Sequence, residues 1–296
     1  MAASPMNPKS HCHARSNSLP SRPHPLILQC NEHLRRLGSD ATSSSSSPIR
    51  HKLSGLQDLH DCVEKLLQLP LTQQSIVQES QEKWVDKLLD GSLRLLDVCT
   101  AAKDSLLHTK ECARELQSII RRRRGGELEL ATEVRKYLVS RKVARNAIHK
   151  SLGNLKAIEK KCTFATANKD HENAELISML REVEAVTLSI FESLLSFISG
   201  PRQTKSKLSS WSLVSKLMQT KRVACTQETD ENEFAKVDAA VQSFALQMTI
   251  KSDNINSLQN LLEKLESHSQ GLEEELESLF RRLIKIRVSV LNILNN

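Results

Sequence analysis

Residues 84–126 carry apolar side chains at helical spacing and end in four arginines and two glycines. Their apolar and small residues follow one another mostly in steps of three and four: Leu88, Gly91, Leu95, Val98, Ala102, Leu106, Ala113, Leu116 and Ile120. Such steps place side chains on one face of an α-helix. The segment therefore predicts one long amphipathic helix, and its apolar face must be covered by other helices.

Similar spacing predicts further helices on both sides of this segment. Two of them end at helix-terminating residues: one helix stops at Pro70, and another stops at Gly200, which is followed by Pro201. The predicted helices cover residues 25–37, 49–69 and 127–162, a segment that begins after capping residues at 168–172 and runs through 199, and a last helix from 234 almost to the end.

Composition supports a fold built from helices. Glycine and proline each occur eight times, aromatic residues make up 3% of the chain, and a hydrophobic content of 39% is sufficient for a core. We expect an all-α protein, an elongated antiparallel helical bundle with long helices and a coiled-coil-like C-terminal helix. The apolar seam of that helix, residues 258–290, can join two copies or fill a single-chain bundle. Extra apolar residues beside the seam favour the bundle.

Three regions differ in composition. Residues 1–24 are rich in Ser, Pro and Arg and contain no acidic residue, which predicts a disordered tail. Residues 25–48 predict a short helix and a Ser-rich linker. Residues 49–296 predict the helical bundle domain, with an acidic loop at about 225–233.

Charge is distributed unevenly along the chain. Residues 121–161 hold thirteen Lys or Arg against four Glu, whereas residues 225–279 hold twelve acidic residues against three Lys. The basic block can bind RNA or an acidic membrane surface, or it can face the acidic segment of the same chain, and both interpretations stay open. The candidate anion-binding face comprises Arg121, Arg122, Arg123, Arg124, Arg135, Lys136, Arg141, Lys142 and Arg145. The four-arginine run by itself is explained as the last turn of a helix.

No pattern in the sequence indicates catalysis. An enzyme needs polar residues that converge in a pocket, and no motif predicts such a cluster, so we expect no enzymatic activity, no cofactor and no metal site. His108 and Cys112 lie four residues apart, as two metal ligands could, but no second pair accompanies them. The seven cysteines include no CxxC pair, which favours reduced thiols inside the cell. No apolar run is long enough to predict a membrane-spanning helix.

Several long stretches of the sequence resemble one plant protein family. They include HKLSGLQDLHDCVEKLLQLPLTQQ, KWVDKLLDGSLRLLDVCTAAKDSLLHTKECARELQSIIRRRRGGE, VRKYLVSRK, SMLREVEAVTLSIFESLLSFISGP and NEFAKVDAA. From about His13 to Asn296, the chain resembles the plant-specific domain-of-unknown-function family related to the BYPASS1-type developmental proteins. The resemblance implies a helical plant protein with no established biochemical activity and a link to root and shoot development. It implies no catalytic residues.

Together, these patterns predict a non-enzymatic, intracellular helical interaction protein in plant development. The alternative is an anion-binding protein that uses residues 121–161 on RNA or acidic membrane surfaces. Expected partners are other proteins, and a second copy of the chain through residues 258–290 is one of the options. We expect a cytoplasmic protein. The acid-poor start also fits a plastid transit peptide, and the arginine run also fits a nuclear signal.

A short motif in the tail predicts phosphorylation-dependent binding. Arg15, Ser16, Ser18 and Pro20 belong to an R-S-x-S-x-P sequence, which resembles the phosphoserine motif bound by 14-3-3 proteins. Arg15 precedes Ser18 by three residues, as basophilic kinases favour. A phosphate on Ser18 would supply negative charge for an arginine cluster on the partner. We therefore expect the tail to be regulated by phosphorylation.

A peptide that spans this motif tests the expectation. When phosphorylated on Ser18, it should bind a purified 14-3-3 protein at least about tenfold more tightly than the unphosphorylated peptide, because the phosphate forms charge-assisted hydrogen bonds with the arginine cluster. Fluorescence anisotropy measures both affinities, with a Ser18→Ala peptide as the control. Equal affinity of the two peptides would exclude the motif.

Overall fold

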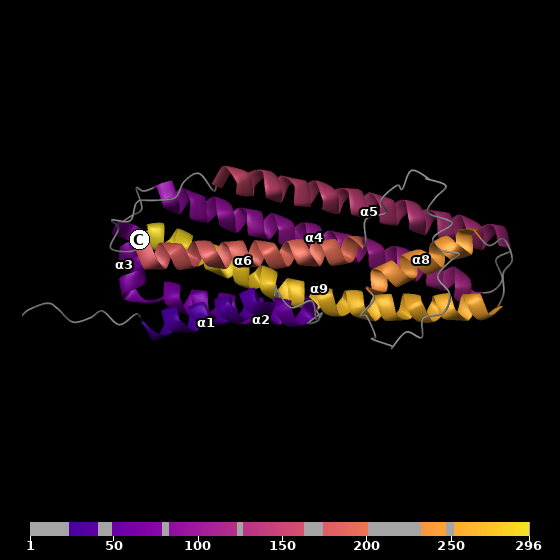
Figure 1. Ribbon diagram of the computed structural model, residues 1–296, viewed down its shortest axis with the longest axis horizontal. Helices are drawn as coiled ribbons and strands as arrows, with labels where there is room; N and C mark the ends of the chain where they lie inside the picture. Colours follow the sequence, from indigo (N-terminus) through magenta and orange to yellow (C-terminus); the bar gives the residue numbers. More distant parts are fainter. Residues whose placement is uncertain are drawn as a thin grey trace, which may run out of the picture.

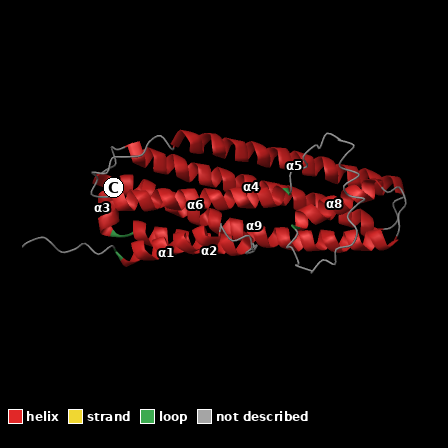
Figure 2. Cartoon of the chain, in the orientation of Figure 1, coloured by secondary structure: helices red, strands yellow, loops and turns green. Residues whose placement is uncertain are grey.

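The computed structural model describes residues 24–40, 49–78, 83–122, 127–162, 174–200, 232–246 and 252–295. In these residues the chain forms helices joined by turns, with no β-strand, so the all-α prediction is confirmed (Figure 2). The helices are α1 (Pro25–Asp40), α2 (Ile49–Leu67), α3 (Pro70–Gln78), α4 (Lys83–Arg122), α5 (Glu127–Cys162), α6 (Ala174–Ser199), α8 (Glu233–Leu246) and α9 (Ser252–Asn295). The acidic loop predicted at about 225–233 lies mostly outside the described residues.

The bundle is elongated, as predicted, and its two longest helices run along most of its length (Figure 1). These helices, α4 and α9, pack against each other and are antiparallel, since Lys103 contacts Glu277 at one level and Arg121 contacts Glu263 at another. Helix α5 packs along α4, and α2 packs along α9. Helix α6 contacts α1, α2, α4, α5 and α8, which joins the two sides of the bundle.

The core consists mainly of the apolar positions that helical spacing predicts. On α4, Leu106 and Leu116 are completely buried, and on α9 the same holds for Leu272 and Leu276. Burial of such aliphatic side chains is the main favourable contribution to folding. The seam of α9 is thus covered by helices of the same chain, mainly α2, α4 and α8. Residues that remain exposed beside it include Ile284 and Val288.

The prediction of one continuous helix from residue 234 is wrong. Two helices occupy this part of the chain, α8 up to Leu246 and α9 from Ser252, and they pack against each other. Two segments of a single straight helix could not pack against each other. The pairing has a physical reason, because it helps to bury the apolar face of α8. Phe234, Val237 and Val241 of α8 are completely buried, and α8 packs mainly against α9 and also against α5 and α6.

A buried ion pair connects α5 with α8. The Arg141 guanidinium, which is 1% exposed, donates two hydrogen bonds to the Asp238 carboxylate, from Nε at 3.0 Å and from Nη2 at 2.9 Å. It also donates to Thr109 Oγ1 of α4 at 3.2 Å and to the Ile198 carbonyl of α6 at 2.9 Å. Burial, followed by the Asp238 charge, raises the pKa of the adjacent Tyr137 hydroxyl well above its usual value. The hydrogen bonds of the Arg141 guanidinium therefore join its own helix, α5, to α4, α6 and α8.

The same cluster closes the ends of two helices. Arg145 donates to the Ser199 carbonyl of α6 at 2.8 Å, and a helix end leaves such carbonyls without intrahelical partners. Gly200 follows with a positive φ of 71°, the left-handed conformation that glycine adopts most easily after a helix. Asn232 caps α8 by accepting a hydrogen bond from the Phe234 amide at 2.9 Å, and it also donates to the Phe197 carbonyl.

Replacement of Asp238 tests the importance of this cluster. Asp238→Ala leaves the buried Arg141 charge without its carboxylate, so the free energy of unfolding should fall by about 3–5 kcal/mol. Chemical denaturation followed by circular dichroism measures the change. Arg35→Ala serves as the control, because it removes an exposed ion pair with Glu32 and should lower the free energy of unfolding far less than Asp238→Ala does.

A second variant separates the effect of charge from the effect of packing. Arg141→Met combined with Asp238→Leu removes both charges and keeps apolar volume, so it should destabilise the protein less than Asp238→Ala alone. An equal or larger loss in the double variant would contradict the view that the unpaired charge causes the destabilisation.

Candidate functional site

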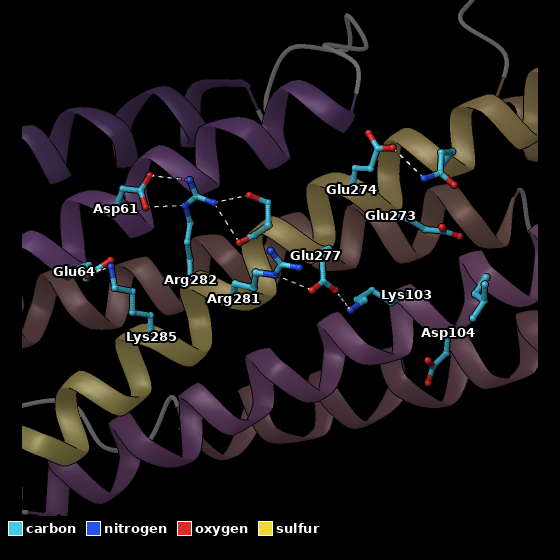
Figure 3. Close-up of a pocket in the computed structure, with 13 residues that line it drawn as sticks. Asp61, Glu64, Lys103, Asp104, Glu273, Glu274, Glu277, Arg281, Arg282 and Lys285 are labelled. Atoms are coloured by element: carbon cyan, nitrogen blue, oxygen red, sulfur yellow. Dashed lines mark hydrogen bonds and ion pairs between the residues drawn. The ribbon is translucent and has the colours of Figure 1, made fainter.

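A charged groove of about 960 Å³ runs between α2, α4 and α9. Six acidic and four basic residues line it: Asp61, Glu64, Asp104, Glu273, Glu274, Glu277, Lys103, Arg281, Arg282 and Lys285 (Figure 3). Most of these come from α9, whose polar face forms the floor between the two other helices. The groove is therefore open, polar and weakly acidic.

On the α2 side, the groove is bordered by two ion pairs. Arg282 donates to both carboxylate oxygens of Asp61, from Nε at 2.7 Å and from Nη2 at 3.0 Å, as Figure 3 shows. Lys285 contacts Glu64 with an Nζ to Oε1 distance of 2.5 Å. The bidentate geometry fixes the direction of the Arg282 side chain. These two pairs hold α9 against α2.

On the α4 side, Glu277 is shared by two cations. Lys103 of α4 donates to it, and Arg281 donates from its own helix at 3.0 Å. These hydrogen bonds, that from Lys103 first, lower the pKa of Glu277, so the carboxylate stays ionised at neutral pH. The Lys103 ammonium also lies 4.8 Å from the centre of the Phe280 ring. Glu277 thus links α9 with α4.

Ion pairs between α4 and α9 continue from the groove toward the C-terminal end of α4. Lys110, which is 5% exposed, donates to Glu273 and to Gln270 Oε1, the latter at 3.0 Å. Arg114 contacts Glu266 at 2.6 Å. Arg121 contacts Glu263 at 3.0 Å. The acidic part of α9 is therefore neutralised mainly by α4.

Two carboxylates at the groove are less constrained. Asp104 and Glu274 are exposed, and within the described part of the chain neither forms an ion pair with a lysine or arginine. Glu274 accepts only a hydrogen bond from Gln270, at 3.0 Å. Leu107, 47% exposed, lies beside them. These residues are free to contact a partner.

The residues of the predicted anion-binding face do not share one environment in the structure. Arg122, Arg135 and Lys142 are exposed. Arg121 and Lys136 have carboxylate partners, Glu263 and Glu133 respectively. Arg123 and Arg124 lie outside the described residues.

The remaining two residues of that face turn toward the protein interior. Arg141 is buried and bound to Asp238, and Arg145 is half-buried on the same carboxylate. The basic block thus meets the acidic segment of its own chain at three residues, Arg121, Arg141 and Arg145. Pairing within the chain therefore accounts for these three residues. Binding of an external anion by the exposed cations stays a prediction.

Other candidates from the sequence have simpler positions. Arg15, Ser16, Ser18 and Pro20 of the tail motif lie outside the described residues, so the motif stays a prediction. The Cys112 thiol and the His108 imidazole both contact the Ser140 hydroxyl. Where the structure describes the chain, no group of three His, Cys, Asp or Glu side chains is arranged to hold a metal ion.

Sequence reasoning did not identify the groove, although a signal for it exists. The cations of α4 that contact α9 lie at positions 103, 110, 114 and 121, in steps of seven, four and seven. Carboxylates of α9 lie at 263, 266, 273 and 277, again at helical spacing. Two complementary charged stripes of this kind predict neighbouring helices.

Comparisons with known proteins assign the family. None of the described helices combines the length and apolar composition that a membrane span requires. Neither the curated proteins nor the solved structures include a match to the chain. The protein family described as Protein BPS1 matches residues 52–293, which contain every residue of the groove. Because the match covers most of the sequence, the chain belongs to the BPS1 family, which indicates a plant developmental protein.

Proposed function

We propose that this protein is a non-enzymatic, intracellular interaction protein in plant development, and that the groove between α2, α4 and α9 is where it binds a protein partner. The observation that carries the proposal is the pair of exposed carboxylates, Asp104 and Glu274, at a groove of about 960 Å³. A groove formed by three packed helices offers a preorganised surface, which lowers the entropy cost of binding.

The charge of the groove defines the partner. Acidic side chains outnumber basic side chains by six to four, so the groove favours a segment that presents lysine or arginine. Leu107 adds an apolar contact at the edge. The most complementary partner is therefore a basic segment with at least one apolar side chain. Phosphorylated Ser18 adds a second, regulated contact, to 14-3-3 proteins.

A charge-reversal variant tests the groove. The full chain with Asp104→Lys and Glu274→Lys should lose at least about tenfold of its affinity for its direct partner, since like charges now face each other. Affinity purification from plant tissue with quantitative mass spectrometry identifies the candidates, and titration with the purified partner measures the affinity.

The control is a second double variant with the same change in net charge. Glu175→Lys and Glu182→Lys alter exposed carboxylates on α6, away from the groove, and should leave binding within about twofold. Circular dichroism of both variants verifies the helical fold. If both variants keep the same partners at the same affinity, the groove is not the binding site.

The outer face of α5 favours a second candidate function, the binding of a polyanion. Val139 and Val143 are exposed there, with Arg135 and Lys142 beside them. In the described part of the chain, α5 packs against α4, α6 and α8, and these four residues lie on the side that none of them covers. Exposed cations with apolar neighbours on one helix face are typical of surfaces that contact RNA or acidic membranes.

Heparin chromatography tests this alternative. The variant Arg135→Gln with Lys142→Gln should elute at a clearly lower salt concentration than the unmodified chain. With two fewer cations, it displaces fewer counterions from heparin on binding, so its affinity is lower. Lys65→Gln with Lys87→Gln, which removes two exposed lysines elsewhere, is the control. No retention of the unmodified chain, or equal shifts of both variants, would count against a binding face on α5.

A further inference from the structure

A second pocket, of about 440 Å³, lies near the C-terminal end of α4 where this helix faces α9. It is lined by Arg114, Gln117, Ser118, Arg121, Arg122 and Glu266. In Figure 1 this is the end of the bundle opposite the marked C-terminus. It is separate from the charged groove and from the outer face of α5, and it contains Arg121 and Arg122 of the predicted anion-binding face.

The lining residues of α4 share one helix face. They are separated by three, one, three and one positions, which places them on neighbouring turns of the same side. Three arginines therefore line one small volume. Arginine presents several N–H donors in a planar array, which matches the oxygens of a phosphate group.

Gln117 supplies an independent indication of a ligand. The residue is only 3% exposed, and its Nε2 atom has no hydrogen-bond partner among the residues that the structure describes. A buried donor without an acceptor is unfavourable, and native proteins satisfy nearly all such groups. An anionic oxygen in the pocket would accept this hydrogen bond.

The charge of the lining fits a dianion. Three arginines and one glutamate give the pocket a net charge of +2. Arg114 is already held by Glu266 at 2.6 Å, and Arg121 contacts Glu263 at 3.0 Å through one of its nitrogens. Arg122 is exposed, and no carboxylate pairs with it in the described part of the chain. The remaining donors of Arg121 and Arg122 are therefore available to a ligand.

We propose that this pocket binds the phosphate of a phosphomonoester, held by Arg121, Arg122 and the Gln117 amide. A phosphomonoester carries close to two negative charges at neutral pH, whereas a phosphodiester or a carboxylate carries one. The phosphate can belong to a lipid headgroup or to a soluble phosphorylated molecule. Both sources present the same terminal group to the pocket.

Two measurements on the full chain distinguish these sources. Isothermal titration calorimetry uses inorganic pyrophosphate as the soluble probe. Sedimentation uses phosphatidylcholine vesicles that contain either phosphatidic acid, a phosphomonoester, or phosphatidylglycerol, a phosphodiester. Saturable pyrophosphate binding with preference for phosphatidic acid vesicles supports a lipid ligand. Pyrophosphate binding without vesicle binding supports a soluble ligand.

Two variants assign the binding to this pocket. Arg122→Gln, at an exposed position, and Gln117→Glu, which keeps the size of the side chain and repels phosphate, should each weaken pyrophosphate binding by about tenfold. Lys65→Gln on α2 removes one exposed charge and should change it less than about twofold. The proposal is wrong if neither probe binds saturably. It is also wrong if Lys65→Gln weakens binding as much as Arg122→Gln does.

Discussion

The antiparallel contact between α4 and α9 is the interaction on which the other parts of the structure depend. Each helix contributes an apolar stripe, with Leu106 and Leu276 completely buried, and each carries charges of opposite sign along the edge of that stripe. Apolar burial supplies the stability, whereas the charge pattern specifies the partner helix and its direction, since a parallel arrangement would bring different residues together. Helices α2 and α5 then pack on the outer sides of this pair. The groove and the phosphate pocket both lie along its edge.

This contact also explains how the basic and acidic halves of the chain are used. Carboxylates of α9 form ion pairs mostly with α4 and, at Glu275, with α2. In the described part of the chain, none of these pairs involves a cation on the outer face of α5. Asp238 of α8 is different, because it binds both Arg141 and Arg145 of α5. The basic helix is therefore neutralised on its inner side and remains cationic on its outer side. An overall charge count could not distinguish these sides, because the direction of each side chain depends on the fold.

Features determined by local sequence could be predicted, and features determined by distant partners could not. Helical spacing identifies the buried positions of α4, and Gly200 marks the end of α6 because the left-handed conformation there is a local requirement. In contrast, Arg141 and Lys142 are adjacent cations on one helix, yet the first is buried and the second exposed. What separates them is Asp238, which lies 97 residues from Arg141. The groove is equally non-local, since its walls come from α2, α4 and α9.

Energetics separates the charges that maintain the fold from those available for binding. Removal of one partner of a buried pair such as Arg141–Asp238 leaves an uncompensated charge in a medium of low polarity, so a ligand cannot easily take over either group. An exposed pair such as Arg121–Glu263 contributes little to stability because water screens it, so Arg121 can exchange this carboxylate for a phosphate at little cost. At the groove, the exposed carboxylates of Asp104 and Glu274 are likewise available for binding, because the fold does not depend on an ion pair with either of them. In both proposed sites beside the α4–α9 contact, the binding residues are therefore exposed charges, held in position by the buried charges and apolar side chains behind them.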